Sequence, residues 1–253
     1  MTVPLKQRLA ARDLLVGTWV KTPSAIVAEV LAGTGLDLLC LDAEHAPFDR
    51  GDLDAAVLAC RALAMPVLVR VPSAAPETIL NALDLGATGV VVPHVVDGAS
   101  AATIARAAHY GPGGRGYAGS SRAANYTRTK MPQHLAASRA ATVVVAQIED
   151  AEAVEAIEAI AAEPGLDCLF IGRADLAVSY GAASAADPVV IAAAERICAA
   201  GLGAGRAVGM FVPDLAEVPR WRGLGVSLFL LESDHTFLIR GAAALAAAVR
   251  APA

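Results

Sequence analysis

The chain is short of positive charge, of paired cysteines and of long apolar segments. Its 20 Lys and Arg residues are outnumbered by 25 Asp and Glu, so the formal charge is -5 and the pI is near 5.5. The arginines are scattered, and the basic patch of a nucleic-acid-binding protein is absent. No window of about 18 residues is apolar enough to span a bilayer, and residues 1–8 lack a signal-peptide core. We therefore expect a cytoplasmic protein with small-molecule ligands and no nucleic-acid or membrane partner.

Cysteine is also sparse. The four cysteines, Cys40, Cys60, Cys168 and Cys198, form no C-x-x-C pair, and each lies within an apolar stretch. This pattern predicts reduced, buried thiols that pack as small hydrophobic side chains, in preference to metal ligands or disulfides.

What the chain has in abundance is alternating apolar segments. Hydrophobic residues make up 56% of the 253 residues, enough for a full core. Ala-rich segments of helical period separate short, β-branched runs, an alternation that predicts one (β/α)8 TIM barrel over residues 1–253. The expected strands are 14–20, 36–41, 66–71, 88–92, 142–148, 166–171, 207–212 and 226–231, and the clearest expected helices are 24–31, 52–63, 76–85, 153–161 and 189–199.

The longest irregular stretch runs from Tyr110 to Pro132 and contains G-P-G-G-R-G. A loop of this length in a compact domain is usually functional or mobile. It is a candidate lid or substrate wall, and an interface loop between subunits fits equally well.

Polar residues gather where the expected strands end, which is the catalytic rim of a barrel. Any one of them could simply cap a helix; their concentration at one rim predicts an active site. They are Trp19, Lys21, Asp42, Glu44, His45, Arg70, Pro93, His94, Gln147, Glu149, Gly172, Arg173, Asp175, Pro213, Ser233 and Asp234.

Glu149 and Asp175 follow consecutive strands, so their carboxylates should lie close together. Two oxygen ligands without a Cys or His pair suit a hard divalent cation such as Mg²⁺ or Mn²⁺. Helix capping explains either acid singly. It explains less well why Gln147 and Gly172 offer an amide and an open backbone at the same place.

His45 is a candidate general acid/base because Asp42 precedes it by three residues at a strand end and could orient the imidazole. By contrast, His109 and His134 are expected at the surface. Arg70 ends an apolar strand, where it could hold a carboxylate or oxyanion, or pair with a rim acid such as Glu44.

The few lysines limit the chemistry further. Only Lys6, Lys21 and Lys130 occur, and Schiff-base catalysis needs a desolvated lysine inside the site. Lys21 alone lies near the rim, among polar residues. An enolate stabilised by a metal is the better route for carbon–carbon chemistry.

Together these motifs resemble the HpcH/HpaI aldolase family of class II metal-dependent pyruvate aldolases, which includes 4-hydroxy-2-oxoheptanedioate aldolase. The resemblance covers nearly the whole chain. Its motifs are G-T-W-V from Gly17, L-D-A-E-H-A-P from Leu41, P-V-L-V-R from Pro66, L-D-L-G-A from Leu83, R-G-Y-A-G from Arg115, Q-I-E from Gln147 and F-I-G-R-A-D-L from Phe170.

The resemblance implies a lyase that cleaves 4-hydroxy-2-oxo acids to pyruvate or hydroxypyruvate and an aldehyde, through a metal-stabilised enolate. Glu149 and Asp175 would hold the Mg²⁺, Mn²⁺ or Co²⁺ ion that the 2-oxo acid chelates. The implied substrate-binding residues are Gln147, Gly172, Arg173, Ala174, Trp19 and Val212.

The same resemblance implies that His45, oriented by Asp42, is the general acid/base, that Arg70 stabilises the oxyanion and that Asp84 tunes the histidine. It also implies a homohexamer, as a trimer of dimers or dimer of trimers, in which the final helix, 237–249, packs on a neighbour. A helix that closes its own barrel would look the same.

This chain departs from the family pattern at several positions. Arg173 stands where proline is common, and His94 where an apolar residue is common. The closing segment L-L-E-S-D-H-T-F-L from Leu230 replaces a more usual valine-glycine step before the aspartate, and F-V-P-D from Phe211 differs in the expected aldehyde pocket. Two alternatives to the aldolase remain: a CoA-ester lyase of the citrate-lyase β type, and a non-catalytic barrel that binds oxo acids.

Overall fold

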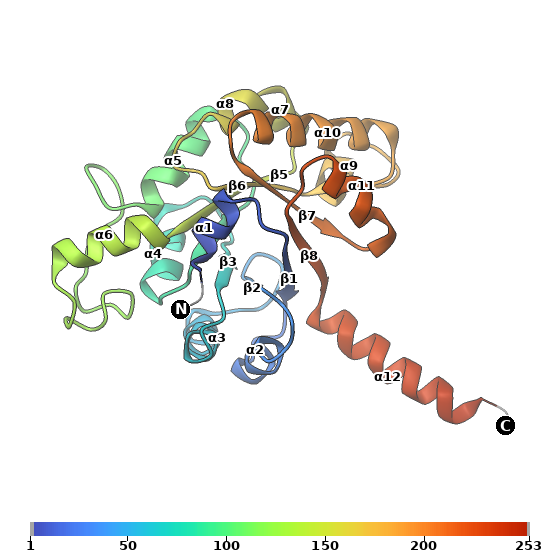
Figure 1. The fold of residues 1–253 in the computed structure, drawn as a ribbon, viewed down its shortest axis with the longest axis horizontal. Helices are drawn as coiled ribbons and strands as arrows, with labels where there is room; N and C mark the ends of the chain where they lie inside the picture. Colours follow the sequence, from blue (N-terminus) through green and yellow to red (C-terminus); the bar gives the residue numbers. More distant parts are fainter. Residues whose placement is uncertain (1–2, 252–253) are drawn as a thin grey trace.

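The computed structural model describes residues 3–251, which form a closed barrel of eight parallel strands in sequence order (Figure 1). All eight expected strands are confirmed. They are β1 (Leu15–Val20), β2 (Leu38–Asp42), β3 (Val67–Arg70), β4 (Gly89–Val92), β5 (Val143–Ile148), β6 (Cys168–Ile171), β7 (Ala207–Val212) and β8 (Leu228–Ser233).

Helices surround the barrel on its outer side (Figure 1). The expected helix 153–161 is interrupted at Ala156 and forms two short helices, α7 and α8. The helices are α1 (Leu5–Ala10), α2 (Ala25–Ala32), α3 (Arg50–Ala62), α4 (Pro76–Asp84), α5 (Gly98–Ala108), α6 (Met131–Ala141), α7 (Ala151–Glu155), α8 (Ile157–Ala161), α9 (Arg173–Ser179), α10 (Pro188–Gly203), α11 (Val218–Gly223) and α12 (Asp234–Arg250), with a 3-10 turn, η1, at Leu215–Glu217.

Two hydrophobic clusters divide the core. One fills the space between strands and helices, and the other fills the barrel interior. Alternate residues of each strand feed the two clusters because successive side chains point to opposite faces. In β7, for example, Val208 and Met210 face the helices while Ala207 and Phe211 face the interior. This alternation decides which residues at the strand ends can point into the barrel interior.

The interior is closed at the end where the strands begin. Leu5 and Leu9 of α1 pack against the interior cluster there. Gly89 gives β4 its close approach to β5, since a Cβ at this position would lie 2.2 Å from the Val143 carbonyl oxygen. The opposite end, where the strands terminate, is left open for ligands.

Helix α12 projects away from the barrel as a separate rod (Figure 1). Its side chains Phe237, Leu238, Ile239, Leu245 and Val249 are exposed. It does not close its own barrel, which is the geometry expected if the helix has a partner elsewhere.

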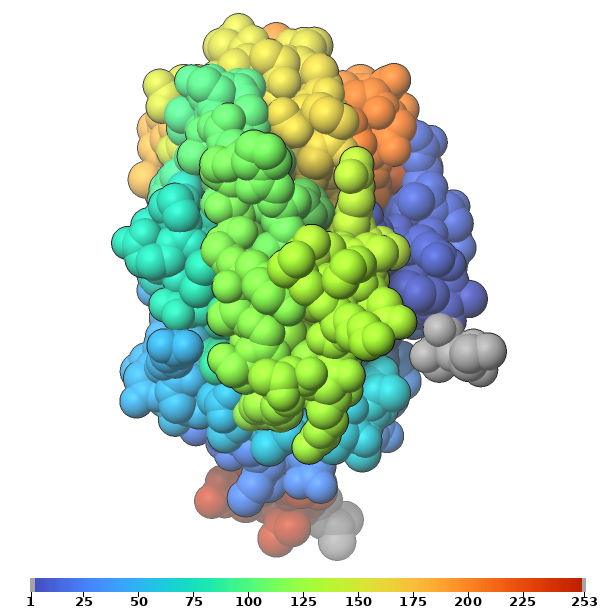
Figure 2. Space-filling model, turned by 90° about the vertical axis from the view of Figure 1, so that its left-hand side faces the viewer, coloured from blue at the N-terminus to red at the C-terminus, as the bar shows by residue number. Residues whose placement is uncertain are grey.

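The segment between α5 and α6 is irregular, as expected, and Figure 2 shows it with both helices on one side of the molecule. His134 corrects an expectation: it is buried, with Nε2 3.0 Å from the Tyr110 hydroxyl. His134 lies on the inward face of α6, which its position in the sequence did not reveal.

The expectation for the cysteines agrees with the structure. All four cysteines are free and buried, and burial raises the pKa of Cys60 to about 11, which makes the reactive thiolate scarce. Within residues 3–251 no helix has the length and hydropathy needed to cross a bilayer.

Candidate functional site

The inward-facing residues at the strand ends line a cavity of about 310 Å³. It brings together ten of the residues that the sequence indicated: Trp19, Lys21, His45, Arg70, Gln147, Gly172, Arg173, Ala174, Asp175 and Ser233. The other lining residues are Phe170, Phe211, Glu232 and Thr236.

Asp42 is fully buried and lies between Lys21 and Arg70, the two cations on one side of the site. Its carboxylate accepts two hydrogen bonds from Arg70, at 2.9 Å from Nε and 2.7 Å from Nη2. A third comes from Lys21 Nζ at 2.6 Å. Although burial opposes ionisation, the hydrogen bonds and charge of Arg70, with the Lys21 bond, hold the pKa of Asp42 well below its usual value.

The expected contact between Asp42 and the His45 imidazole is wrong. Asp42 Oδ1 instead accepts the backbone N–H of His45 at 3.1 Å. The imidazole points out into the cavity, with Nε2 3.5 Å from Glu44 Oε2 and a side chain that is 55% exposed. Asp42 therefore shapes the turn that presents His45, and Glu44 is the carboxylate that faces the ring.

Arg70 is held on three sides. Besides Asp42, its Nε lies 3.3 Å from Glu44 Oε2, and its guanidinium stacks 4.2 Å from the centroid of the Trp19 ring. The ion pair with Glu44 that the sequence left open is therefore present. A planar, pre-positioned guanidinium at a cavity wall is suited to bind a carboxylate or an oxyanion.

The lowered pKa of Asp42 predicts an acid-dependent stability. A carboxyl whose pKa is lower in the folded state stabilises the fold above its unfolded pKa, about 3.9, and loses that contribution as the pH falls further. Urea unfolding of wild type and Asp42→Asn should therefore differ by a constant free energy from pH 7 to about pH 4. The difference should shrink below pH 4; a difference that grew on acidification would contradict this prediction.

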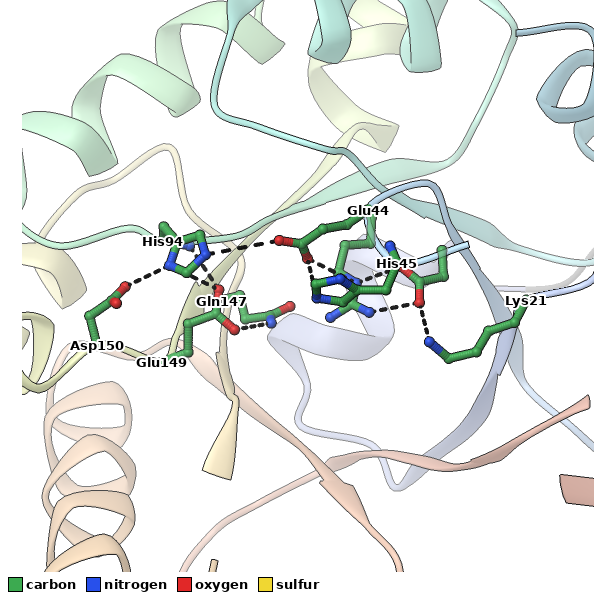
Figure 3. Close-up of polar contacts among 9 residues, drawn as sticks. Lys21, Glu44, His45, His94, Gln147, Glu149 and Asp150 are labelled. Carbon is green, nitrogen blue, oxygen red and sulfur yellow. Dashed lines mark hydrogen bonds and ion pairs between the residues drawn. The ribbon is translucent and has the colours of Figure 1, made fainter. Parts of the chain in front are cut away.

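Glu149 is the centre of the acidic side of the site, and Figure 3 shows its neighbours. Its carboxylate accepts hydrogen bonds from the Gln147 amide and, at 2.9 Å, from the backbone N–H of His94. The ring of the same His94 lies next to Asp150, with Nδ1 3.0 Å from Asp150 Oδ2. Burial raises the pKa of Glu149, because among the described residues no Lys or Arg pairs with it.

The residues around Glu149 fit a divalent cation. A buried carboxylate without a Lys or Arg partner needs positive charge nearby. The Gln147 Oε1 atom is buried without a hydrogen-bond partner, and Asp175 lies on the wall of the same cavity. Only glycine fits at Gly172, since a Cβ there would lie 3.0 Å from Glu149 Oε2. Hard oxygen donors of this kind suit Mg²⁺ or Mn²⁺.

A second arrangement of donors lies at the same carboxylate. Ligand atoms of Glu44, His94 and Glu149 all lie within 4.8 Å of one another. His94 has a left-handed backbone, with φ of 53°, which directs its N–H to Glu149. The hydrogen bond to Asp150 and the nearby charges of Glu149 and Glu44 raise the pKa of His94.

Within one chain Asp84 lies away from the rim, so its expected role in tuning His45 stays a prediction. It ends α4, and a nine-residue helix carries it about 13 Å back from the rim where the helix begins. There it pairs with Arg115, which also stacks on the Tyr110 ring. Within one chain, Asp84 fixes the loop after α5 and does not touch the imidazole.

Val212 and Arg173 are also placed differently from the expectation. The Val212 side chain faces the helices, and Phe211 takes its place on the cavity wall. Arg173 lines the cavity, but its guanidinium turns to Glu217 Oε2 at 2.6 Å and stacks 5.1 Å from the Trp221 centroid. The extra cation is thus paired with Glu217 and not with Glu149 or Asp175.

Sequence reasoning did not assign Glu232 to the cavity, and it named Phe211 only as the first residue of F-V-P-D in the expected aldehyde pocket. Both could have been found by counting in steps of two from the inward-facing Leu228 in β8 and Ala207 in β7. It also considered Lys21 only as a Schiff-base residue, whereas the structure pairs it with Asp42.

A larger hollow, of about 910 Å³, lies at the opposite end of the barrel. Its lining includes Lys6, Arg106, His109 and Arg139 but none of the paired acids of the rim. Because barrel enzymes use the end where strands terminate, the smaller cavity is the candidate active site.

Known proteins are similar to this chain along nearly its whole length. Residues 15–240 match the family model described as HpcH/HpaI aldolase/citrate lyase. The hydroxypyruvate/pyruvate aldolase of Paraburkholderia phytofirmans is 38% identical over 94% of each chain. The 4-hydroxy-2-oxovalerate aldolase of Rhodococcus jostii is 36% identical, covering 96% of this chain and 94% of that protein.

Solved structures give the same result. A crystal structure of an HpcH/HpaI aldolase/citrate lyase family protein from Burkholderia cenocepacia superposes with a TM-score of 0.91 at 38% identity. The match covers 98% of this chain and 99% of that one.

Proposed function

Because this chain belongs to the HpcH/HpaI aldolase/citrate lyase family, we propose that it is a class II 2-oxo acid aldolase. It reversibly cleaves 4-hydroxy-2-oxo acids to an aldehyde and pyruvate, or a close analogue such as hydroxypyruvate. The observation that carries this proposal is one cavity that unites His45, the fixed guanidinium of Arg70 and Asp175. Directly behind its wall residue Gln147 lies Glu149, a buried acid that has no Lys or Arg partner among the described residues.

Glu149 and Asp175 would hold the divalent cation, and Gln147 with the backbone of residues 172–175 would bind the oxo acid beside it. When bound there, the cation supplies Lewis-acid polarisation of the keto group. Every other group needed for the reaction comes from the chain itself.

His45 would move the proton. In cleavage, its imidazole takes the proton of the 4-hydroxyl group as the bond between carbons 3 and 4 breaks and the aldehyde forms. In the reverse direction it returns that proton to the new alkoxide. Its exposed ring, facing Glu44, is free to approach substrate within the cavity.

Arg70 would stabilise the negative charge that develops on oxygen during this step. Its bidentate bond to Asp42 and its stack on Trp19 hold the guanidinium in place before substrate arrives. Asp42 acts through Arg70 and through the backbone of His45, as a positioning residue. Trp19, Phe170 and Phe211 form the apolar part of the cavity wall.

Two assays with the purified protein test the proposal. In D₂O with Mg²⁺ or Mn²⁺, NMR should show exchange of the pyruvate methyl protons, and 4-hydroxy-2-oxo acids should be cleaved. Excess chelator should abolish both reactions, and added metal should restore them.

Other outcomes would favour the alternatives. Pyruvate binding without exchange would indicate a non-catalytic barrel, and tight binding of acetyl-CoA in calorimetry would indicate a CoA-ester lyase. Full activity in excess chelator would exclude the metal.

A homo-oligomer, with the hexamer as the expected state, would give α12 its missing partner. Light scattering should report a mass well above the 25.7 kDa of one chain. Because Leu238 and Leu245 are both exposed on α12, Leu238→Glu with Leu245→Glu should reduce the mass. A monomeric wild-type protein would contradict this expectation.

A further inference from the structure

Glu232 places a carboxylate on the cavity wall at a cost in backbone energy. It follows the inward-facing Leu228 and Leu230 of β8 in steps of two, and it lines the cavity. Its φ of 49° is left-handed, a conformation that favours glycine and is strained for other residues. Strain of this kind persists where the position serves a function.

Glu232 has a single ion-pair partner, Arg240 of α12, whose Nη2 lies 2.6 Å from Oε1. The two members of the pair are buried unequally: the Glu232 side chain is 14% exposed and that of Arg240 is 66% exposed. Water screens the arginine much more than the glutamate. The Glu232 carboxylate is therefore the less screened charge of the pair.

The cations on the cavity wall do not offset this charge. Lys21 and Arg70 share the carboxylate of Asp42, and Arg173 is paired with Glu217. Among the described residues, the cavity thus offers no Lys or Arg without a carboxylate partner. A second carboxylate on the substrate would meet Glu232, whose charge only the exposed Arg240 partly balances.

The order of strands assigns Glu232 to the aldehyde end of the cavity. The proposed metal acids follow β5 and β6, and in a closed eight-stranded barrel β1 and β2 lie across from them. Glu232 ends β8, which pairs with β1, and the hydroxyls of Ser233 and Thr236 line the same wall. The oxo acid at the metal would therefore extend its aldehyde portion toward this wall.

We propose that Glu232 selects uncharged, hydroxylated acceptor aldehydes and rejects those that carry a carboxylate. The carboxylate accepts hydrogen bonds from acceptor hydroxyls and repels acceptor anions, and Arg240 moderates the repulsion from outside. This inference rests on the proposed aldolase function and names the acceptor class of that same site.

The test compares two acceptors of nearly equal size. Glyceraldehyde carries a hydroxymethyl group where tartronate semialdehyde carries a carboxylate, and each is offered with pyruvate to the metal-loaded enzyme. The measured quantity is the kcat/KM for tartronate semialdehyde divided by that for glyceraldehyde. Glu232→Gln should raise this ratio about tenfold, because like charges that face each other in a cavity repel strongly.

Arg240→Ala should move the ratio in the opposite direction, because it removes the charge that partly balances Glu232. Glu29→Gln, an exposed substitution on α2, is the control and should leave the ratio unchanged. The pyruvate proton exchange involves no acceptor, so in wild type and in Glu29→Gln it reports the donor chemistry separately and should be equal in the two.

The possible outcomes distinguish a failure of the inference about Glu232 from a failure of the proposed aldolase function. If exchange is normal but both variants change the two acceptors by the same factor, Glu232 has only a structural role and the inference is wrong. A ratio above one in wild type would also overturn it. Absence of exchange in the wild-type enzyme would reject the aldolase function itself, and this inference with it.

Discussion

Glu149→Gln is expected to lower kcat/KM by about 1000-fold while leaving the metal-free protein at least as stable as wild type. The loss in activity reflects the metal, whose Lewis-acid contribution of about 4 kcal/mol corresponds to that factor. A neutral amide is a much weaker ligand for a hard cation than a carboxylate.

The burial of Glu149 explains why Glu149→Gln should leave the free energy of unfolding unchanged or raise it. Because the pKa of Glu149 is raised, its ionised form destabilises the fold as the pH rises above the usual pKa of about 4.3. Glutamine removes that charge and keeps an oxygen for the His94 N–H. Rotation of the Gln147 amide would then turn its unpartnered Oε1 toward the new NH₂ group.

Calorimetric titration with Mn²⁺, kinetics and urea unfolding check this prediction together. Glu152→Gln, an exposed change on α7, is the matched control and should be neutral in all three. Wild-type metal affinity in Glu149→Gln would show that Glu149 is not a ligand. A large loss of stability would show that its charge is compensated in a way the contacts do not indicate.

Asp42→Ala is expected to have the largest effect on stability, a loss of about 3–5 kcal/mol in the free energy of unfolding. It leaves Arg70 in a buried position with only the longer contact to Glu44, and uncompensated buried charge carries this cost. For a chain of this size the midpoint of thermal unfolding should fall by about 10 °C. Calorimetry or circular dichroism measures the shift.

Two further variants show whether the cost comes from burial. Asp54→Ala breaks another Asp–Arg pair, with Arg122, but Asp54 is 43% exposed and the loss should stay below about 1 kcal/mol. The double variant Asp42→Leu with Arg70→Met replaces the buried pair by apolar side chains, so it should recover much of the stability and none of the activity. Equal losses for Asp42→Ala and Asp54→Ala would contradict the role of burial.

The fold was predictable because its signals are local. Each strand is a short β-branched run, and each intervening segment has helical period, so the eightfold alternation is readable without any contact. The barrel rule then places every strand end at one rim, which is why Gln147, Arg70 and Asp175 were all found to share one cavity.

The side-chain pairings within the site were not predictable, because they depend on the register between neighbouring strands and on the turns that follow the strands. Asp42 was expected to face His45, three residues away, yet its partner is Arg70, which lies opposite it in the register of β2 and β3. The turn after Asp42 directs a backbone N–H, not the ring of His45, to the carboxylate. The pairing of Asp84 with Arg115 was equally hidden, because it joins the end of α4 to the loop after α5.

The sequence by itself determined the barrel fold, the rim where the strands end and the kinds of side chain found at that rim. Hydrophobic periodicity and strand ends can be recognised in consecutive residues, without knowledge of tertiary contacts. Only the tertiary structure decided which cation holds Asp42, that Phe211 and not Val212 faces the cavity, and that Glu232 adds a charge to its wall. These facts depend on strand register and backbone dihedral angles, which arise from contacts between residues far apart in the chain.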